Sequence, residues 1–311
     1  MNTAEYFTIP PDLVRGPQAD ALVMAGEANW GIQAFGVPML RAAGKNGKGV
    51  IVGVVDTGIG SHPELSNLIN ARDFTGSPSG PNDRNGHGTH CSGTIGSTNP
   101  NIGMANEVGL VHGKGLSDQG SGSGQWIASA MQWCYQQKAD IISMSLGSSS
   151  EDGYITGAIR ELAQQGVWVI CAGGNSGPNT PNVDWPGRSE HCIDVAALNA
   201  DLTPASFSSA GEKIDTAFAG VNIWSCRPGG GYQQMSGTSM ATPGAAGVLA
   251  LYRAGLKEAK RKVPTIYELR NILLSRSTDT HTPGKDRRTG PGWVSSVLLE
   301  LDLTPEPPPK V

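Results

Sequence analysis

The stretch GVIVGVVD, residues 49–56, is a continuous apolar run that ends in an acid. Most of its residues are β-branched, and polar residues do not alternate with them, which predicts a strand buried on both faces. Such strands belong to parallel sheets that helices cover on both sides. Ligands bind outside the carboxyl ends of these strands, so Asp56 is a candidate site residue.

Beyond Lys48, short apolar runs alternate with amphipathic stretches. Four further strands are predicted, at 110–114, 140–145, 167–171 and 193–197, with helices at 126–138 and 153–165. In the second helix, Ile155, Ile159 and Leu162 recur at helical spacing. This alternation predicts an α/β fold: a doubly wound, mostly parallel sheet with helices on both faces, in a single domain.

Residues 236–254 predict a third helix, whose Gly and Ala residues leave almost no side chain on any face. Pro243 is tolerable there only near the first turn, because proline lacks the N–H that a helix interior requires. We expect this helix to be buried in close contact with its neighbours.

The composition limits the partners that the chain can have. Its 311 residues carry a formal net charge of −4, which argues against nucleic acid or a membrane surface as a partner. No stretch reaches the roughly 18 apolar residues of a membrane span. The opening MNTAEYFTIPPDLVRG has an early acid and two prolines instead of a basic start and an apolar run. We therefore expect a cytoplasmic protein, with secretion not excluded.

The five cysteines show no metal-type spacing. Cys134, Cys171 and Cys192 lie within apolar runs, where a free cysteine behaves as a small buried hydrophobe. We expect all five to be reduced and structural, which fits a cytoplasmic protein.

Three segments carry the residues of a chemical mechanism: VVDTGI with Asp56, NGHGTHCSG with His87, and SGTSMATP with Ser239. Each alone has an ordinary explanation, as a strand-end cap, a loop histidine or a helix N-cap. Together they meet one requirement. A serine hydroxyl needs an imidazole to take its proton, and the imidazole needs a carboxylate to fix its tautomer.

These segments resemble the signatures of the subtilisin-like serine proteases, and the order Asp, His, Ser is the order found in subtilisin. The similarity runs from about Lys48 to about Val294 and includes SMSLG (143–147), AGGNSG (172–177), ASFSSAG (205–211) and GPGWV (290–294). The resemblance implies a serine endopeptidase that cleaves proteins or peptides through an acyl-enzyme. A peptide ligase or macrocyclase and a catalytically inactive binding module remain as alternatives.

The resemblance also implies roles for other residues. Asn175 matches the asparagine that stabilises the oxyanion. Two segments match the strands that bind an extended substrate: Gly120, Ser121 and Gly122 on one side, and Ser145, Leu146 and Gly147 on the other. Asp184, in NVDWPG, falls near the base of the pocket for the residue before the scissile bond. A carboxylate there would favour Lys or Arg, and a solvated loop Asp is the alternative.

The chemistry requires no cofactor, but the family commonly holds a structural Ca²⁺. Glu64, in SHPEL, matches an acidic calcium ligand, and the loop STNPNIGMANEVG (97–109) matches the other part of the site. Pro100 stands where an amide ligand is expected and offers no side-chain oxygen, so the site would be weakened or lost.

We predict an N-terminal extension at 1–45, a peptidase domain at 46–300 and a proline-rich tail at 301–311. In character the chain is closest to the bacterial intracellular subtilisins, whose short extension lies across the active site. Residues 7–11, FTIPP, loosely resemble its motif, and a proline near the scissile position could bind yet resist cleavage. The extension is thus either inhibitory or a plain leader, and a homodimer is left open.

Overall fold

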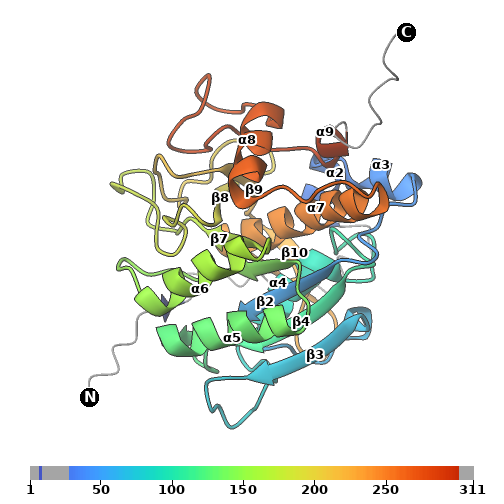
Figure 1. Ribbon diagram of the computed structural model, residues 1–311, viewed down its shortest axis with the longest axis vertical. Coiled ribbons are helices and arrows are strands. Elements are labelled where there is room, and N and C mark those ends of the chain that lie inside the picture. Colours follow the sequence, from blue (N-terminus) through green and yellow to red (C-terminus); the bar gives the residue numbers. More distant parts are fainter. Residues whose placement is uncertain (1–6, 9–27, 301–311) are drawn as a thin grey trace.

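The computed structural model describes residues 7–8 and 28–300, and its centre is a seven-stranded sheet (Figure 1). The strand order is β3-β4-β2-β6-β7-β8-β9, and every neighbouring pair is parallel. The strands are β2 (Ile51–Asp56), β3 (Leu68–Asp73), β4 (Gly109–Lys114), β6 (Ile141–Met144), β7 (Trp168–Ala172), β8 (Ile193–Leu198) and β9 (Thr216–Ala219). The predicted fold class and the five predicted strands are confirmed.

The chain changes direction across the sheet at β2. It first builds β3 and β4 on one side of β2 and then β6 to β9 on the other. Such a reversal is where ligands bind in an open parallel sheet. Asp56 is the last residue of β2, so its carboxylate stands at this point.

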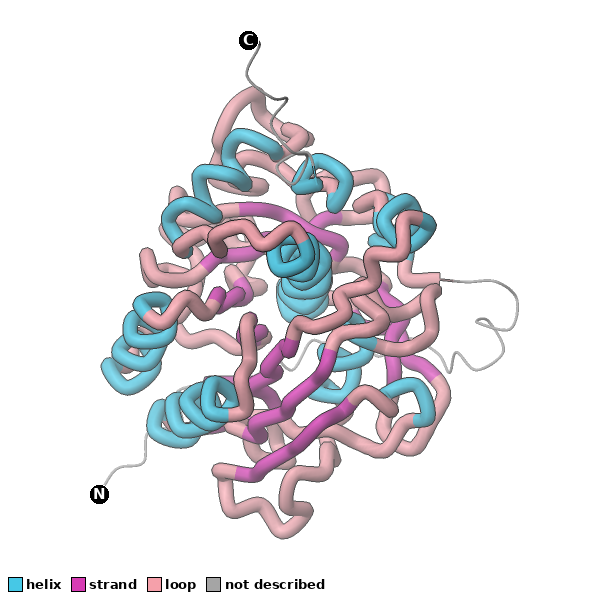
Figure 2. Tube along the Cα trace, turned by 45° about the vertical axis from the view of Figure 1, so that its right-hand side comes forward, coloured by secondary structure: helices cyan, strands magenta, loops and turns pink. Residues whose placement is uncertain are grey.

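Helices cover both faces of the sheet (Figures 1 and 2). On one face, α5 (Gly124–Gln136) and α6 (Gly153–Gln164) pack against the strands in one apolar cluster. On the other, α4 (His87–Gly96) and α7 (Thr238–Glu258) share a larger cluster. The amphipathic pattern predicted α5 and α6 to within two residues at each end.

The small residues of α7 allow the predicted close contact. A Cβ added at Gly247 would lie 2.5 Å from the Cβ of Met104. Pro243, in contrast, lies inside the helix and not near its first turn as predicted. The helix tolerates it because the carbonyl four residues earlier, that of Ser239, accepts hydrogen bonds from side chains outside the helix.

Residues of the predicted N-terminal extension pack in the core of the domain. The short helices α2 (Trp30–Ala34) and α3 (Val37–Ala42) place Ile32, Phe35 and Val37 in the larger apolar cluster. The centroid of the Phe35 ring lies 4.4 Å from the centroid of the Phe218 ring on β9. The packed domain therefore includes residues before position 45, whereas most of 1–27 and the tail 301–311 lie outside the described residues.

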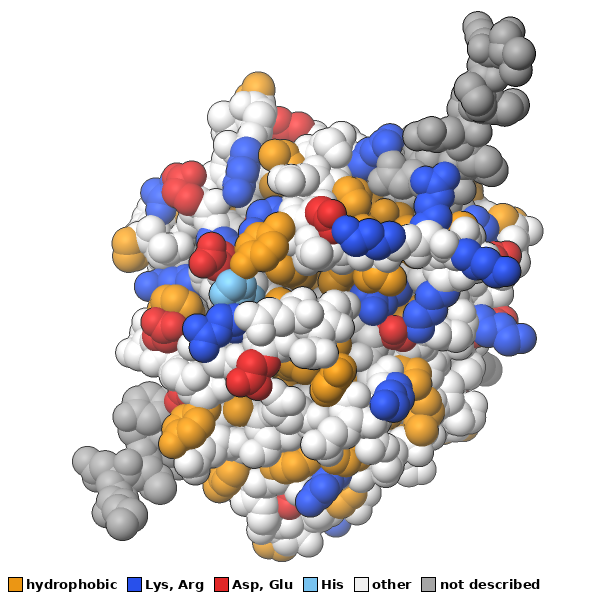
Figure 3. Space-filling view, viewed as in Figure 1, with side chains coloured by type: hydrophobic (Ala, Val, Ile, Leu, Met, Phe, Trp, Pro, Cys, Tyr) orange, Lys and Arg blue, Asp and Glu red, His pale blue; other side chains and the backbone are white. Residues whose placement is uncertain are grey.

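The remaining elements are short or peripheral. They are β1 (Phe7–Thr8), η1 (Pro63–Leu65), β5 (Ser121–Gly122), the antiparallel pair β10 (Ile223–Cys226) and β11 (Tyr232–Met235), α8 (Ile266–Arg276) and α9 (Ser296–Glu300). All five cysteines are free and buried. Within 7–8 and 28–300, no helix combines the length and the apolar character that crossing a membrane requires. On the face shown in Figure 3, acidic and basic side chains are interspersed.

Candidate active site

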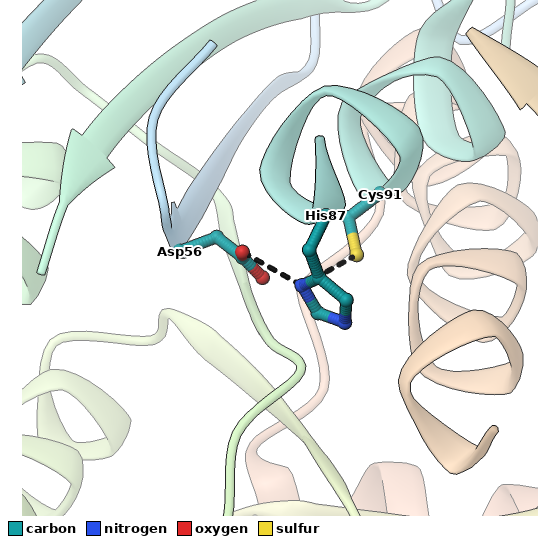
Figure 4. Close-up of side chains that lie close together, drawn as sticks. All are labelled: Asp56, His87 and Cys91. Atoms are coloured by element: carbon teal, nitrogen blue, oxygen red, sulfur yellow. Dashed lines mark hydrogen bonds and ion pairs between the residues drawn. The ribbon is translucent and has the colours of Figure 1, made fainter. Parts of the chain in front are cut away.

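Asp56 and His87 form a buried pair at the carboxyl end of β2 (Figure 4). His87 Nδ1 donates to Asp56 Oδ1 at 2.7 Å, and both side chains are fully buried. His87 begins α4 immediately after Gly86, whose φ of +97° lets the chain turn into the helix. The Asp83 carboxylate secures this turn, because it accepts from the backbone N–H groups of Gly86 and Thr89.

The pairing shifts both pKa values. Burial opposes ionisation of Asp56, but the neighbouring His87 outweighs it and lowers the pKa of the carboxyl. Burial likewise opposes charging of the imidazole, yet the Asp56 carboxylate raises the pKa of His87 above its ordinary value. Asp56 therefore stabilises the imidazolium that forms when His87 takes a proton.

The other ring nitrogen of His87, Nε2, is buried and has no hydrogen-bond partner among the described residues. Ser239, in the first turn of α7, is 3% exposed, and its hydroxyl donates to the carbonyl of Ser145 at 3.4 Å. The Ser239 hydroxyl thus faces Ser145 and forms no hydrogen bond with His87 in this state. Catalytic hydrogen bonds often form only once substrate is bound, so this geometry is compatible with a later transfer to Nε2.

Cys91 lies between the histidine and the serine. Its Sγ is 3.8 Å from His87 Nδ1 (Figure 4). The thiol also donates to the carbonyl of Ser239 at 3.5 Å. Burial raises the pKa of this thiol, so it is a neutral group that fills space behind the ring. No motif in the sequence marks Cys91 as a site residue, although a residue four positions after His87 shares its helix face.

The side chain of Asn175 is held in one orientation. Its Oδ1 accepts from the backbone N–H and the hydroxyl of Thr238, at 2.9 and 3.0 Å. The amide oxygen is therefore engaged on the side of α7, which leaves the Nδ2 group as the available donor. Asn175 also follows β7, so it stands at the same edge of the sheet as Asp56.

The two candidate substrate segments border this edge. Gly120 precedes β5, whose residues Ser121 and Gly122 pair antiparallel with Thr8 and Phe7 of β1. The other segment, 145–147, follows β6; its Ser145 contacts Ser239, and its Leu146 is buried. The strand edge of β5 that could receive a peptide is thus paired with a segment of the chain itself.

Asp184 lies between two glycines of the neighbouring segments. A Cβ added at Gly174 would be 2.3 Å from Asp184 Oδ2, and one added at Gly147 would be 3.3 Å from the same oxygen. The carboxylate therefore sits between segment 145–147 and the segment that carries Asn175. Burial raises the pKa of Asp184, and Arg188 acts in the opposite direction.

A second acid, Asp194 on β8, lies behind these segments. A Cβ added at Gly187 would be 2.2 Å from its Oδ1, and one at Gly173 would be 3.2 Å from its Oδ2. Asp194 is fully buried, and within the described part of the chain neither of its side-chain oxygens has a hydrogen-bond partner. Burial raises its pKa to about 7. No motif in the sequence marks Asp194 as a site residue, because it is a lone acid within an otherwise apolar strand.

Glu64 is surrounded by hydrogen-bond donors. Its carboxylate accepts from the Ser97 hydroxyl at 2.8 Å, from the Asn99 amide at 3.1 Å, and from the Tyr232 hydroxyl. The predicted acid and the predicted loop are therefore adjacent, and the protein itself supplies partners for both carboxylate oxygens.

The chain is similar in sequence to known proteins. Residues 47–292 match the model of the Subtilase family. The chain is 40% identical over 278 residues to the intracellular serine protease of Paenibacillus polymyxa, covering 84% of this chain and 85% of that protein. It is 37% identical over 260 residues to the major intracellular serine protease of Bacillus subtilis (strain 168), covering 79% and 82%. The M-protease of Shouchella clausii (strain KSM-K16) is 38% identical over 283 residues, covering 89% and 71%.

Proposed function

Because the chain belongs to the subtilase family of serine proteases, we propose that it is an endopeptidase whose catalytic triad is Asp56, His87 and Ser239. The observation that carries this proposal is the buried 2.7 Å hydrogen bond between Asp56 and His87. This hydrogen bond keeps the imidazole in the tautomer in which Nδ1 carries the proton. Nε2 has no partner within the described residues and can therefore accept a proton.

The reaction follows from these positions. Ser239 Oγ attacks the scissile carbonyl while its proton moves to His87 Nε2, and Asp56 stabilises the imidazolium. His87 then gives that proton to the departing amine, which leaves an acyl-enzyme on Ser239. A water molecule, deprotonated by the same nitrogen, hydrolyses the ester and restores the free serine.

Two donors would stabilise the oxyanion of the tetrahedral intermediates. The backbone N–H of Ser239 is in the first turn of α7, where N–H groups lack partners within the helix. The Nδ2 group of Asn175 is the second donor, and the contacts of its Oδ1 with Thr238 pre-orient it. Loss of one such donor costs about 10²–10³ in turnover in a subtilisin.

The substrate would bind as an extended strand between segments 120–122 and 145–147, with β-sheet hydrogen bonds to its main chain. Support comes from β5, which already pairs with an extended segment of this chain. Asp184 would give a preference for Lys or Arg before the scissile bond, because its carboxylate lies where segment 145–147 meets the segment of Asn175.

We further propose that the N-terminal segment keeps the enzyme latent until it is removed. The pairing of Phe7 and Thr8 with Gly122 and Ser121 uses the strand edge that a substrate would use. In the same state His87 is fully buried and Ser239 is 3% exposed, although a substrate must reach both.

Two similar proteins carry the word intracellular in their names, and we propose that this protein also acts inside the cell.

Product masses test the reaction type. The active enzyme is incubated with a defined peptide substrate together with a second peptide that has a free α-amine. Hydrolysis predicts two fragments whose masses sum to the substrate plus one water. A product that joins one fragment to the added peptide would identify a ligase, and an unchanged substrate under conditions in which the chain is folded would favour an inactive binding module.

A further inference from the structure

The loop after α4, which the family resemblance assigns to calcium, has its backbone oxygens engaged by the protein. The carbonyl of Asn99 accepts from the N–H groups of Ile102 and Gly103, at 3.0 and 3.1 Å. Asn29, just before α2, donates its backbone N–H to Asn101 O at 2.9 Å and its side-chain amide to Ile102 O at 3.4 Å. Three of the six carbonyls between positions 99 and 104 are thus satisfied.

Arg41 satisfies the remaining three. It stands in the last turn of α3, and its guanidinium donates to the carbonyls of Pro100, Gly103 and Met104, the last at 3.3 Å. Burial lowers the pKa of Arg41 to about 10, so the group is still a cation at neutral pH. A fixed positive charge therefore lies against the carbonyl oxygens of a loop whose counterpart in the family surrounds a metal ion.

The other ligand group does not fit calcium either. Calcium requires roughly six to eight oxygen ligands at about 2.3–2.6 Å. The oxygens of Glu64 instead accept from Ser97, Asn99 and Tyr232, and Pro100 has no side-chain oxygen to add. A calcium ion would have to displace hydrogen bonds that α3 and the loop already form.

We propose that the Arg41 guanidinium replaces the structural calcium ion of this loop, so that the loop is ordered without a metal. An arginine suits this role because its planar guanidinium presents several N–H donors at once to carbonyls that approach from different directions. The cation is then part of the chain, and the order of the loop does not depend on the calcium concentration around the protein. The same contact fastens α3 to the domain.

The test measures the loop directly by amide hydrogen exchange. The full-length chain carries Ser239→Ala to prevent self-digestion and is compared in EGTA and in CaCl₂. The amides of Ile102 to Ala105 should exchange at the same rate in both. Arg41→Met should accelerate their exchange about tenfold or more, because it removes three hydrogen bonds that hold the loop.

Two further variants control the comparison. Arg160→Met removes an exposed arginine on α6 and should leave the loop unchanged. If Arg41→Met does not fold, Arg41→Lys gives the same measurement. A lysine ammonium is a compact point charge that lacks the planar spread of donors of a guanidinium, so exchange should still rise. Slower exchange of these amides on adding CaCl₂ to the chain that has Arg41 would overturn the proposal. Unchanged exchange in Arg41→Met or Arg41→Lys would overturn it as well.

Discussion

The hydroxyl of Ser145 donates a 2.8 Å hydrogen bond to the carbonyl oxygen of Ser239. That carbonyl needs a partner because Pro243, four residues later in α7, has no N–H to offer it. The neutral thiol of Cys91 adds a weaker contact to the same oxygen. The backbone of the proposed nucleophile is therefore held by the segment that is proposed to bind the substrate.

Ser145→Ala should disturb the nucleophile more than the binding of substrate. We expect kcat to fall by about tenfold with little change in KM, because the backbone of Ser239 loses its main anchor. Stability is measured in the Ser239→Ala background, which keeps the backbone carbonyl at position 239. There, Ser145→Ala should lower the free energy of unfolding by about 1–3 kcal/mol.

Ser143→Ala is the matched control. Ser143 is buried on β6, and its hydroxyl has no hydrogen-bond partner within the described residues. Its removal should change stability by less than about 0.5 kcal/mol or increase it. A cost equal to that of Ser145→Ala would show that the loss comes from packing and not from the hydrogen bond.

Asp194 should make stability fall as the pH rises. Its folded-state pKa of about 7 lies above the ordinary value of 3.8, so between these values the folded state binds more protons than the unfolded state. The contribution of Asp194 to the free energy of unfolding is full below about pH 4 and is lost as the pH rises through 7. Lys213 lowers this pKa, while Asp215 and Asp184 raise it.

Asp194→Asn should therefore be more stable than its parent at pH 8, by at most about 4 kcal/mol, and similar to it near pH 4. Urea unfolding of the Ser239→Ala chain at both pH values measures the difference. Glu151→Gln, an exposed acid, should show no such effect. A variant less stable than the parent at pH 8 would mean that the carboxylate has a stabilising partner.

Asp184 should determine the preference for the residue before the scissile bond. Matched peptide substrates with Arg or Phe at this position should show a higher kcat/KM for Arg. Asp184→Asn should lower the value for Arg about tenfold or more and leave Phe unchanged. Because burial raises the pKa of Asp184, the preference for Arg should increase as the pH rises through that raised pKa and the carboxyl ionises. Equal cleavage after Arg and Phe by the parent enzyme would contradict this role.

Removal of the N-terminal segment should release activity. A chain that lacks residues 1–20 loses β1 and should hydrolyse peptides faster than the full-length chain before any self-processing. A chain that lacks only residues 1–5 keeps Phe7 and Thr8, and with them the pairing with β5, so it should stay latent. If both deletions left the initial rate unchanged, the segment would not be inhibitory.

The sequence predicted the elements that have a strong pattern and missed those that have none. Buried strands such as β2 and β7 are continuous apolar runs, so they were found with bounds close to the observed ones. The edge strand β3 reads LINARD and is partly exposed, so it has no such run. The helices α2 and α3 span only five and six residues, too few for a helical period to be visible.

The same division holds at the site. Asp56 and His87 lie in segments with distinct signatures, and the structure brings them together. Asp194 has no motif around it and was missed. Arg41 had no signal either, because its partners are backbone carbonyls about 60 residues away in the chain. Backbone oxygens are present at every position, so no residue type in the sequence marks them as a binding site.

The central claim is that Ser239 is an activated nucleophile, and intact mass after treatment with phenylmethylsulfonyl fluoride tests it most directly. Wild type, Ser239→Ala and the chain that lacks residues 1–20 are treated side by side at several pH values. We predict a single adduct on the shortened chain and none on Ser239→Ala. Its formation should slow as the pH falls below the raised pKa of His87, since an imidazolium cannot accept the serine proton. The absence of an adduct from every folded form that contains Ser239 would contradict the account.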